Sequence, residues 1–119
     1  MTDELTGEQQ SELEAALTAL AAELEGHIEG AAGGAKPVDL DEPIGRLSRM
    51  DAMQQQQMAA ATKRGFEARL LQVRAALARI AVGEFGDCAD CEEPIGFRRL
   101  RARPEARRCT TCQDVADRR

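Results

Sequence analysis

Four cysteines are the feature that most limits what this chain can fold into. Two C-x2-C pairs stand seventeen residues apart, and the 119 residues contain no other cysteine than Cys88, Cys91, Cys109 and Cys112. Each pair directs two sulfurs towards a common centre, and the residues between the pairs suffice for a short antiparallel ribbon that brings the second pair alongside the first. The spacing therefore predicts one structural Zn²⁺ held by four thiolates.

Disulfide bonds are the alternative use for two such pairs. The chain begins Met1-Thr2-Asp3, with neither the basic nor the apolar region of a secretory signal, so we expect it to stay in the cytoplasm, where cysteines remain reduced. No apolar run approaches the roughly 20 residues of a membrane span. These observations favour zinc over disulfides, and we expect no contact with a membrane.

Leucine spacing predicts two long helices rather than a broad globular core. Three Phe, no Trp and no Tyr leave little bulk for such a core. After a capping box at Thr6 and Gln9, one heptad stripe comprises Leu13, Leu17, Leu20 and Leu24. A second stripe comprises Phe66, Leu70, Val73, Leu77 and Ile80. We expect helices over about residues 7–29 and 45–82.

Together these patterns predict a mainly α fold with two parts. Residues 1–83 form an antiparallel two-helix coiled-coil hairpin, with a tip loop over about residues 30–45. Residues 84–119 form a small four-cysteine zinc-finger module with a short C-terminal helix. The hairpin is an elongated shape, and we expect the chain to be a monomer.

Charge alternates in sign along the chain, although the net charge is only −5. Residues 1–42 contain eleven acids and one base, whereas residues 43–83 contain seven bases and two acids. Residues 84–97 contain five acids and no base, and residues 98–119 contain eight arginines and three acids. The first two blocks favour pairing of the two helices, because each would repel a second copy of itself.

Two smaller features have alternative interpretations. His27, the single histidine, continues the first stripe, and we interpret it as a residue at the edge of the helical seam rather than as a zinc ligand. Met50, Met53 and Met58 stand among glutamines and alanines, as either a loosely packed core or a surface that adapts to a partner. Their helical spacing favours the core interpretation.

The end of the chain resembles the zinc-finger signature of the DksA/TraR (DnaK-suppressor) family of bacterial transcription regulators. The matching positions begin with Phe85-Gly86-Asp87-Cys88-Ala89-Asp90-Cys91 and close with Cys109-Thr110-Thr111-Cys112. Between them the resemblance covers Ile95, Arg99-Leu100, Ala102, Pro104 and Ala106. The helical hairpin is also the architecture of the family, so the resemblance extends back to about Gly7.

This resemblance implies that the partner is RNA polymerase. Family members insert the hairpin into the secondary channel of the polymerase and rest the zinc finger on its rim, without touching DNA and often together with ppGpp. Carried over to this chain, the tip residues would be Asp39, Asp41, Glu42, Arg46, Arg49 and Asp51. The residues of the zinc-finger arm that face the partner would be Arg98, Arg99, Arg101 and Arg103.

The tip departs from the family pattern. The best-studied members carry D-x-x-D-x-A there, and counting back from Cys88 without gaps places Gly45, Ser48 and Met50 in those positions. A register shifted by six residues restores two acids, Asp39 and Glu42, but not the alanine. The part played by ppGpp therefore stays open.

Three classes of function follow. The first is a regulator of RNA polymerase, and the second is a zinc-stabilised hairpin adaptor for another protein. A nucleic-acid-binding zinc finger is a third, opposed by the net charge of −5 and by the scarcity of aromatic side chains near the arginines. We expect no catalytic activity, since a four-thiolate zinc leaves no open position and no catalytic set of side chains is present.

Overall fold

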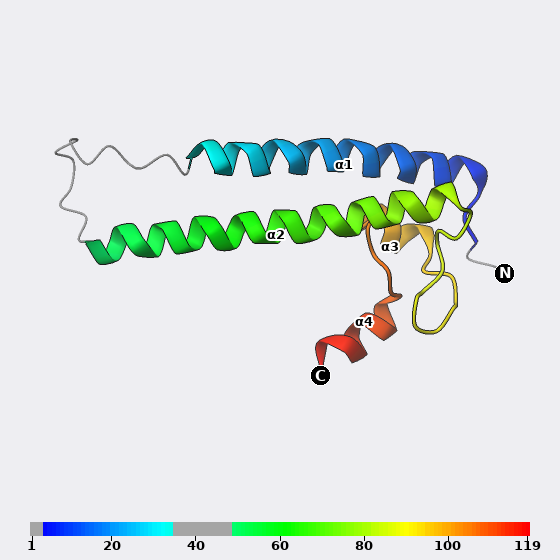
Figure 1. The fold of residues 1–119 in the computed structure, drawn as a ribbon. Helices are drawn as coiled ribbons and strands as arrows, with labels where there is room; N and C mark the ends of the chain where they lie inside the picture. Colours follow the sequence, from blue (N-terminus) through cyan, green and yellow to red (C-terminus); the bar gives the residue numbers. More distant parts are fainter. Residues whose placement is uncertain (1–3, 35–48) are drawn as a thin grey trace.

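The computed structural model of this protein has four helices in the residues that it describes. It describes residues 4–34 and 49–119. The helices are α1 (Gly7–Gly34), α2 (Arg49–Ala81), α3 (Phe97–Ala102) and α4 (Thr110–Asp117). Helices α1 and α2 run antiparallel along the length of the molecule, α3 lies beside the C-terminal end of α2, and α4 lies below α3, away from the hairpin (Figure 1). The mainly α fold with a coiled-coil hairpin is thus confirmed.

Helix α1 starts where the capping box predicts. The backbone N–H of Gln9 donates to Thr6 Oγ1 at 3.1 Å, and the N–H of Thr6 donates to Gln9 Oε1 at 3.0 Å. These bonds satisfy backbone donors that have no partner inside the helix. The expected end at Glu29 was wrong, because α1 continues through Gly30 to Gly34. A glycine destabilises a helix by only about 1 kcal/mol relative to alanine, and the neighbouring alanines favour the helix.

The two predicted stripes meet in one buried seam, except for Leu13, which packs in a second cluster with α3. Its buried members are Leu17 and Leu24 from α1, and Leu70, Val73 and Ala76 from α2. Around them pack the partly buried side chains of Leu20, Ile28, Phe66, Leu77 and Ile80. The small side chain of Ala76 lies between the helices, so it is fully buried whereas the neighbouring Leu77 is only partly covered.

Charged and aromatic contacts flank this seam. Arg74 Nη2 donates to Glu25 Oε1 at 2.9 Å and so joins basic α2 to acidic α1. Both side chains are about half exposed, and such a pair contributes only about 0.2–1 kcal/mol. His27 stacks on Phe66 with ring centroids 5.0 Å apart and an interplanar angle of 19°. Its interpretation as a residue at the seam edge is confirmed.

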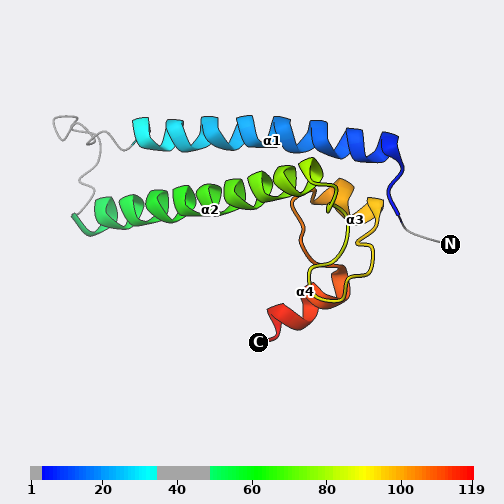
Figure 2. The same ribbon diagram turned by 45° about the vertical axis from the view of Figure 1, so that its right-hand side comes forward.

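The methionines of α2 do not form a core, so that interpretation was wrong. Met50, Met53 and Met58 are 72%, 58% and 70% exposed. The first turns of α2 extend past the end of α1 in both ribbon views (Figure 2). No described residue of α1 lies opposite them, so their helical spacing does not correspond to a packed face.

A glycine turn leads from α2 into the C-terminal segment. Gly83 has φ +76°, and the N–H of Glu84 donates to the carbonyl of Arg79 at 2.8 Å, which closes the last turn of α2. Gly86 has φ +110°, and a Cβ at this position would lie 3.2 Å from the Leu5 side chain. Both its conformation and its close packing therefore require glycine.

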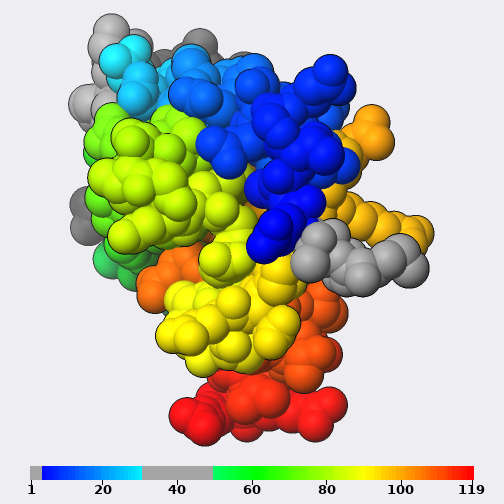
Figure 3. Space-filling view, turned by 90° about the vertical axis from the view of Figure 1, so that its right-hand side faces the viewer, coloured from blue at the N-terminus to red at the C-terminus, as the bar shows by residue number. Residues whose placement is uncertain are grey.

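The residues between the two cysteine pairs do not form the predicted ribbon. In residues 4–34 and 49–119 there is a single antiparallel bridge, Asp87 with Pro94, which flanks the first pair, and the chain then forms α3. Leu100 of α3 is fully buried against Leu13 of α1, in a second cluster that includes Ala106, Leu5, Phe85, Ile95 and Phe97. In Figure 3 the chain just after α2 (yellow) lies beneath the paired ends of α1 (blue) and α2 (green).

A buried carboxylate also joins the C-terminal segment to the hairpin. The Glu105 side chain is 1% exposed and accepts a hydrogen bond from Arg69 Nε of α2 at 2.9 Å. Arg103 Nε lies 3.4 Å from the same oxygen. Among the described residues Glu105 Oε2 has no partner. Since removing one member of a buried pair is costly, Glu105 helps to fix where this segment sits. The division into domains at residues 83 and 84 stays a prediction.

Adjacent leucines test the seam. We expect Leu70→Ala to lower the free energy of unfolding by about 2–5 kcal/mol, because Leu70 is 6% exposed and its loss leaves a cavity. Leu71→Ala is the control, since Leu71 is 67% exposed and its truncation should change stability by about 0.5 kcal/mol or less. Urea unfolding followed by circular dichroism measures both, and equal losses would contradict the seam.

Candidate metal centre

Two turns position the four cysteines. Cys88 and Cys91 flank a turn in which the N–H of Glu92 donates to the carbonyl of Cys88 at 3.0 Å. Cys109 is the N-cap of α4, and its sulfur accepts the N–H of Cys112 at 3.4 Å. Each pair is thus positioned by the hydrogen bonds of its own turn.

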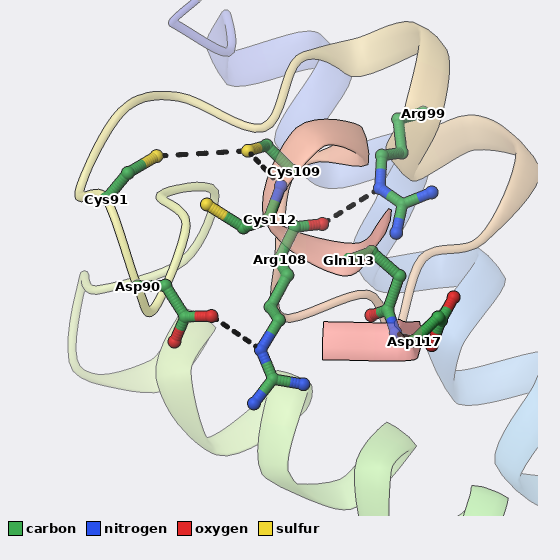
Figure 4. A network of polar contacts seen from close by, with 8 residues as sticks. All are labelled: Asp90, Cys91, Arg99, Arg108, Cys109, Cys112, Gln113 and Asp117. Carbon is green, nitrogen blue, oxygen red and sulfur yellow. Dashed lines mark hydrogen bonds and ion pairs between the residues drawn. The ribbon is translucent and has the colours of Figure 1, made fainter. Parts of the chain in front are cut away.

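Two hydrogen bonds join the segment of Cys88 and Cys91 to the residues just before Cys109, and a third fixes those residues to α3. The N–H of Ala89 donates to the carbonyl of Arg107 at 2.8 Å. Arg108 Nε donates to Asp90 Oδ2 at 2.7 Å, and Arg99 Nε donates to the carbonyl of Arg108 at 2.8 Å (Figure 4). The acidic residues 84–97 and the basic residues 98–119 are therefore joined by an ion pair, Asp90 with Arg108, next to the cysteines.

The four sulfurs lie at the separation that zinc requires. All of them lie within 4.8 Å of one another, and the sulfurs of Cys91 and Cys109 are 3.8 Å apart. A tetrahedral zinc with bonds of about 2.3 Å places its sulfurs about 3.8 Å apart. Cys88 is buried, Cys91 is exposed, and Cys109 and Cys112 are partly exposed. The cluster fits one structural zinc ion, as predicted.

The close packing of the four sulfurs affects the pKa values of the cysteines. Burial opposes ionisation of Cys88, but backbone hydrogen bonds at Cys91, Cys109 and Asp90 outweigh it and lower its pKa to about 6. In contrast, the hydrogen bond to the Cys109 sulfur and desolvation raise the pKa of Cys112 to about 12. Four neighbouring sulfurs cannot all ionise unaided, whereas a dication stabilises every thiolate.

The predicted partner-binding residues fall into two groups. Asp39, Asp41, Glu42 and Arg46 lie outside the described residues, Arg49 begins α2, and Asp51 lies exposed in its first turn. Of the arginine arm, Arg98 and Arg101 are exposed on α3, Arg99 bonds to the Arg108 carbonyl, and Arg103 lies beside Glu105. The structure therefore places these arginines next to the metal centre, but Arg99 and Arg103 form contacts within the protein.

Glu105 is the residue that sequence reasoning missed. It is the single acid among the arginines between Phe97 and Cys109, and that isolation was the available signal. A lone carboxylate in a basic segment is well suited to pair with a base on another element, here Arg69.

Fold and site together define a class of protein: an antiparallel helical hairpin that carries a C4-type zinc finger at its base. No helix in the described part of the chain is long and apolar enough to cross a membrane.

Comparison with known proteins agrees with this class. The model of the prokaryotic dksA/traR C4-type zinc finger matches residues 83–118. The RNA polymerase-binding transcription factor DksA of Haemophilus influenzae is 41% identical over 46 residues, which cover 39% of this chain and 32% of that protein. The chain thus matches about a third of the length of this relative.

Solved structures extend the similarity to the hairpin. The transcription factor DksA2 from Pseudomonas aeruginosa is 29% identical, with a TM-score of 0.77 over 94% of this chain and 85% of that one. The DnaK suppressor protein from Agrobacterium tumefaciens C58 is 25% identical, with a TM-score of 0.55 over 88% of this chain and 91% of that one. Residues 83–118 thus match the zinc-finger model of the DksA/TraR family, and the resemblance inferred from the sequence is confirmed.

Cys88→Ser tests the metal centre. We expect this variant to lose zinc and to expose residues 84–112 to protease while the hairpin keeps most of its helicity, because metal binding and folding are coupled in small zinc modules. The control is Ala89→Ser, which adds a hydroxyl at the next residue and leaves four cysteines. A Cys88→Ser protein with one bound zinc and the parental protease pattern would contradict the assignment.

Proposed function

We propose that this chain is a bacterial transcription regulator that binds RNA polymerase through protein contacts. The observation that carries the proposal is the similarity to DksA2, which includes both the hairpin and the finger. The relative from Haemophilus influenzae is named as RNA polymerase-binding and supports the same partner. Such a protein would act in the cytoplasm, and we propose that it does so as a monomer.

The shape suits entry into a channel. Helix α2 contains 33 residues and is therefore about 50 Å long. The whole molecule measures 64 × 32 × 20 Å, with the finger at one end of the hairpin. We propose that the hairpin enters the secondary channel of the polymerase while the finger rests on the rim. The tip residues would then be Asp39, Asp41, Glu42, Arg46, Arg49 and Asp51.

The finger would contribute basic side chains to the rim contact. Arg98 and Arg101 form no ion pair with any described residue, and Arg103 is 63% exposed although it lies beside Glu105. Arg99 would act mainly by holding Arg108. These arginines suit an acidic protein surface, where pairs with carboxylates gain from desolvation.

Zinc would be structural, with Cys88, Cys91, Cys109 and Cys112 as its ligands. Bound there, it supplies a cross-link between two chain segments rather than a reactive centre, because four thiolates complete its tetrahedron. We propose accordingly that the protein is not an enzyme. The proposal does not extend to ppGpp, because no register of the tip restores the D-x-x-D-x-A pattern.

The same departure at the tip favours one second candidate. A hairpin that has lost this pattern could serve as a zinc-stabilised adaptor for another protein. The two functions differ in whether RNA polymerase is the partner, so one binding experiment separates them.

Titration of the zinc-loaded protein against core RNA polymerase is that experiment. We expect micromolar or tighter binding that a known secondary-channel factor displaces, because the two proteins would occupy the same channel. Binding without displacement would place this protein elsewhere on the polymerase. No binding at micromolar concentrations would favour the adaptor.

Simultaneous replacement of Asp39, Asp41 and Glu42 by Ala tests the tip. We expect stability to change little and the effect on transcription in vitro to weaken. The control replaces the exposed Glu4, Glu8 and Glu12 at the other end of the hairpin, which removes the same charge. Equal transcriptional output from both variants and the parent protein would show that the acidic tip is only solvated.

A further inference from the structure

Helix α2 carries a second apolar stripe on the face that points away from α1. Its members follow the heptad spacing of four and three residues and are all exposed: Ala68, Leu71, Ala75, Ala78 and, one residue after the helix ends at Ala81, Val82. Leu71 and Val82 are each 67% exposed, whereas Val73, two residues from Leu71, is fully buried in the seam. At 3.6 residues per turn, two residues correspond to about 200° around the helix. The stripe is therefore an unpartnered helix face and not an extension of the seam.

The stripe leads into a hollow between α2 and the finger. This hollow has a volume of about 350 Å³ and is lined by Ala75 and Arg79 of α2 and by Ala89 and Arg107 of the finger. Alanines at positions 75 and 78 allow a second backbone to approach α2 closely. The finger thus forms a wall beside an apolar helical surface.

Positive charge borders this surface. Arg79 and Arg107 form no ion pair with any described residue. Partial burial and the charge of Arg107 lower the pKa of Arg79, so the two guanidinium groups lie close enough to repel each other. Glu84 and Asp87 also line the hollow, yet neither pairs with these arginines within 4.0 Å in the described part of the chain.

Helix α2 as a whole also carries a net positive charge. The helix contains six bases and two acids, and Arg64, one turn before Ala68, is exposed and forms no ion pair with a described residue. A second copy of this face would be repelled by these bases. An apolar helical surface with unpaired arginines at both ends instead matches a helix with an apolar stripe and acidic flanks.

We propose that the outer face of α2, from Ala68 to Val82, docks an acidic amphipathic helix of a protein partner. The stripe is about 21 Å long, which corresponds to about four turns of such a helix. Leucines of the partner would pack on Leu71 and Val82 and over the alanines, and its carboxylates would pair with Arg64, Arg79 and Arg107. This surface is separate from the hairpin tip and does not depend on RNA polymerase as the partner.

Fluorescence anisotropy with a designed peptide tests the proposal on the whole zinc-loaded protein. The probe is a labelled helical peptide of about two heptads, the length of the stripe, with Leu at the a and d positions and Glu on the flanks. We expect saturable binding that weakens with added salt, and none by the same peptide with Lys in place of Glu. No saturation up to about 1 mM, or equal binding of the two peptides, would overturn the proposal.

Matched variants locate the binding surface. Leu71→Glu and Arg79→Glu should each weaken binding by about tenfold or more. Met58→Glu and Arg118→Glu are the controls, since Met58 is 70% exposed about 140° around α2 from Leu71 and Arg118 lies at the far end of α4. Circular dichroism checks that all four variant proteins are folded. Unchanged binding by Leu71→Glu and Arg79→Glu, or losses in the controls, would overturn the proposal, and the polymerase titration would be unaffected either way.

Discussion

The buried contact between Leu13 of α1 and Leu100 of α3 determines how this molecule is arranged, because it joins the finger to the base of the hairpin. Leu100 lies on a helix of only six residues, which has little stability of its own. The four-cysteine cluster brings together the chain segments before and after that helix, and Glu105 adds a bond to α2. We therefore expect metal binding to support the formation of α3, and α3 in turn to dock the finger onto α1.

Charge contributes specificity around that contact rather than most of the stability. The ion pair between Arg74 and Glu25 is half exposed and worth little, yet it belongs to a pattern that favours acidic α1 over a second basic α2. Glu105 is different, because its carboxylate is buried and bonded to Arg69 of α2. If Glu105 were removed, two arginines would face each other and the orientation of the finger would loosen.

Sequence alone predicted the parts of this structure that depend on local rules. The capping box at Thr6, the leucine seam and the cysteine spacing each act over a few residues or one repeating period, and all three are observed. Prediction from sequence failed where the contacts of a side chain come from a segment that is distant in the chain. Helical spacing could not show that α1 ends before it covers Met50 and Met53, and nothing near Glu105 in the chain shows that Arg69 lies beside it.

Photo-crosslinking within a complex with RNA polymerase tests the central claim most directly. A photoreactive amino acid replaces Met53, exposed near the tip end of α2, or Arg101, exposed on α3 of the finger. If the hairpin enters the secondary channel, position 53 crosslinks to residues that line the channel interior and position 101 crosslinks to its rim. A complex in which position 53 crosslinks only to the outer surface of the polymerase would contradict the account.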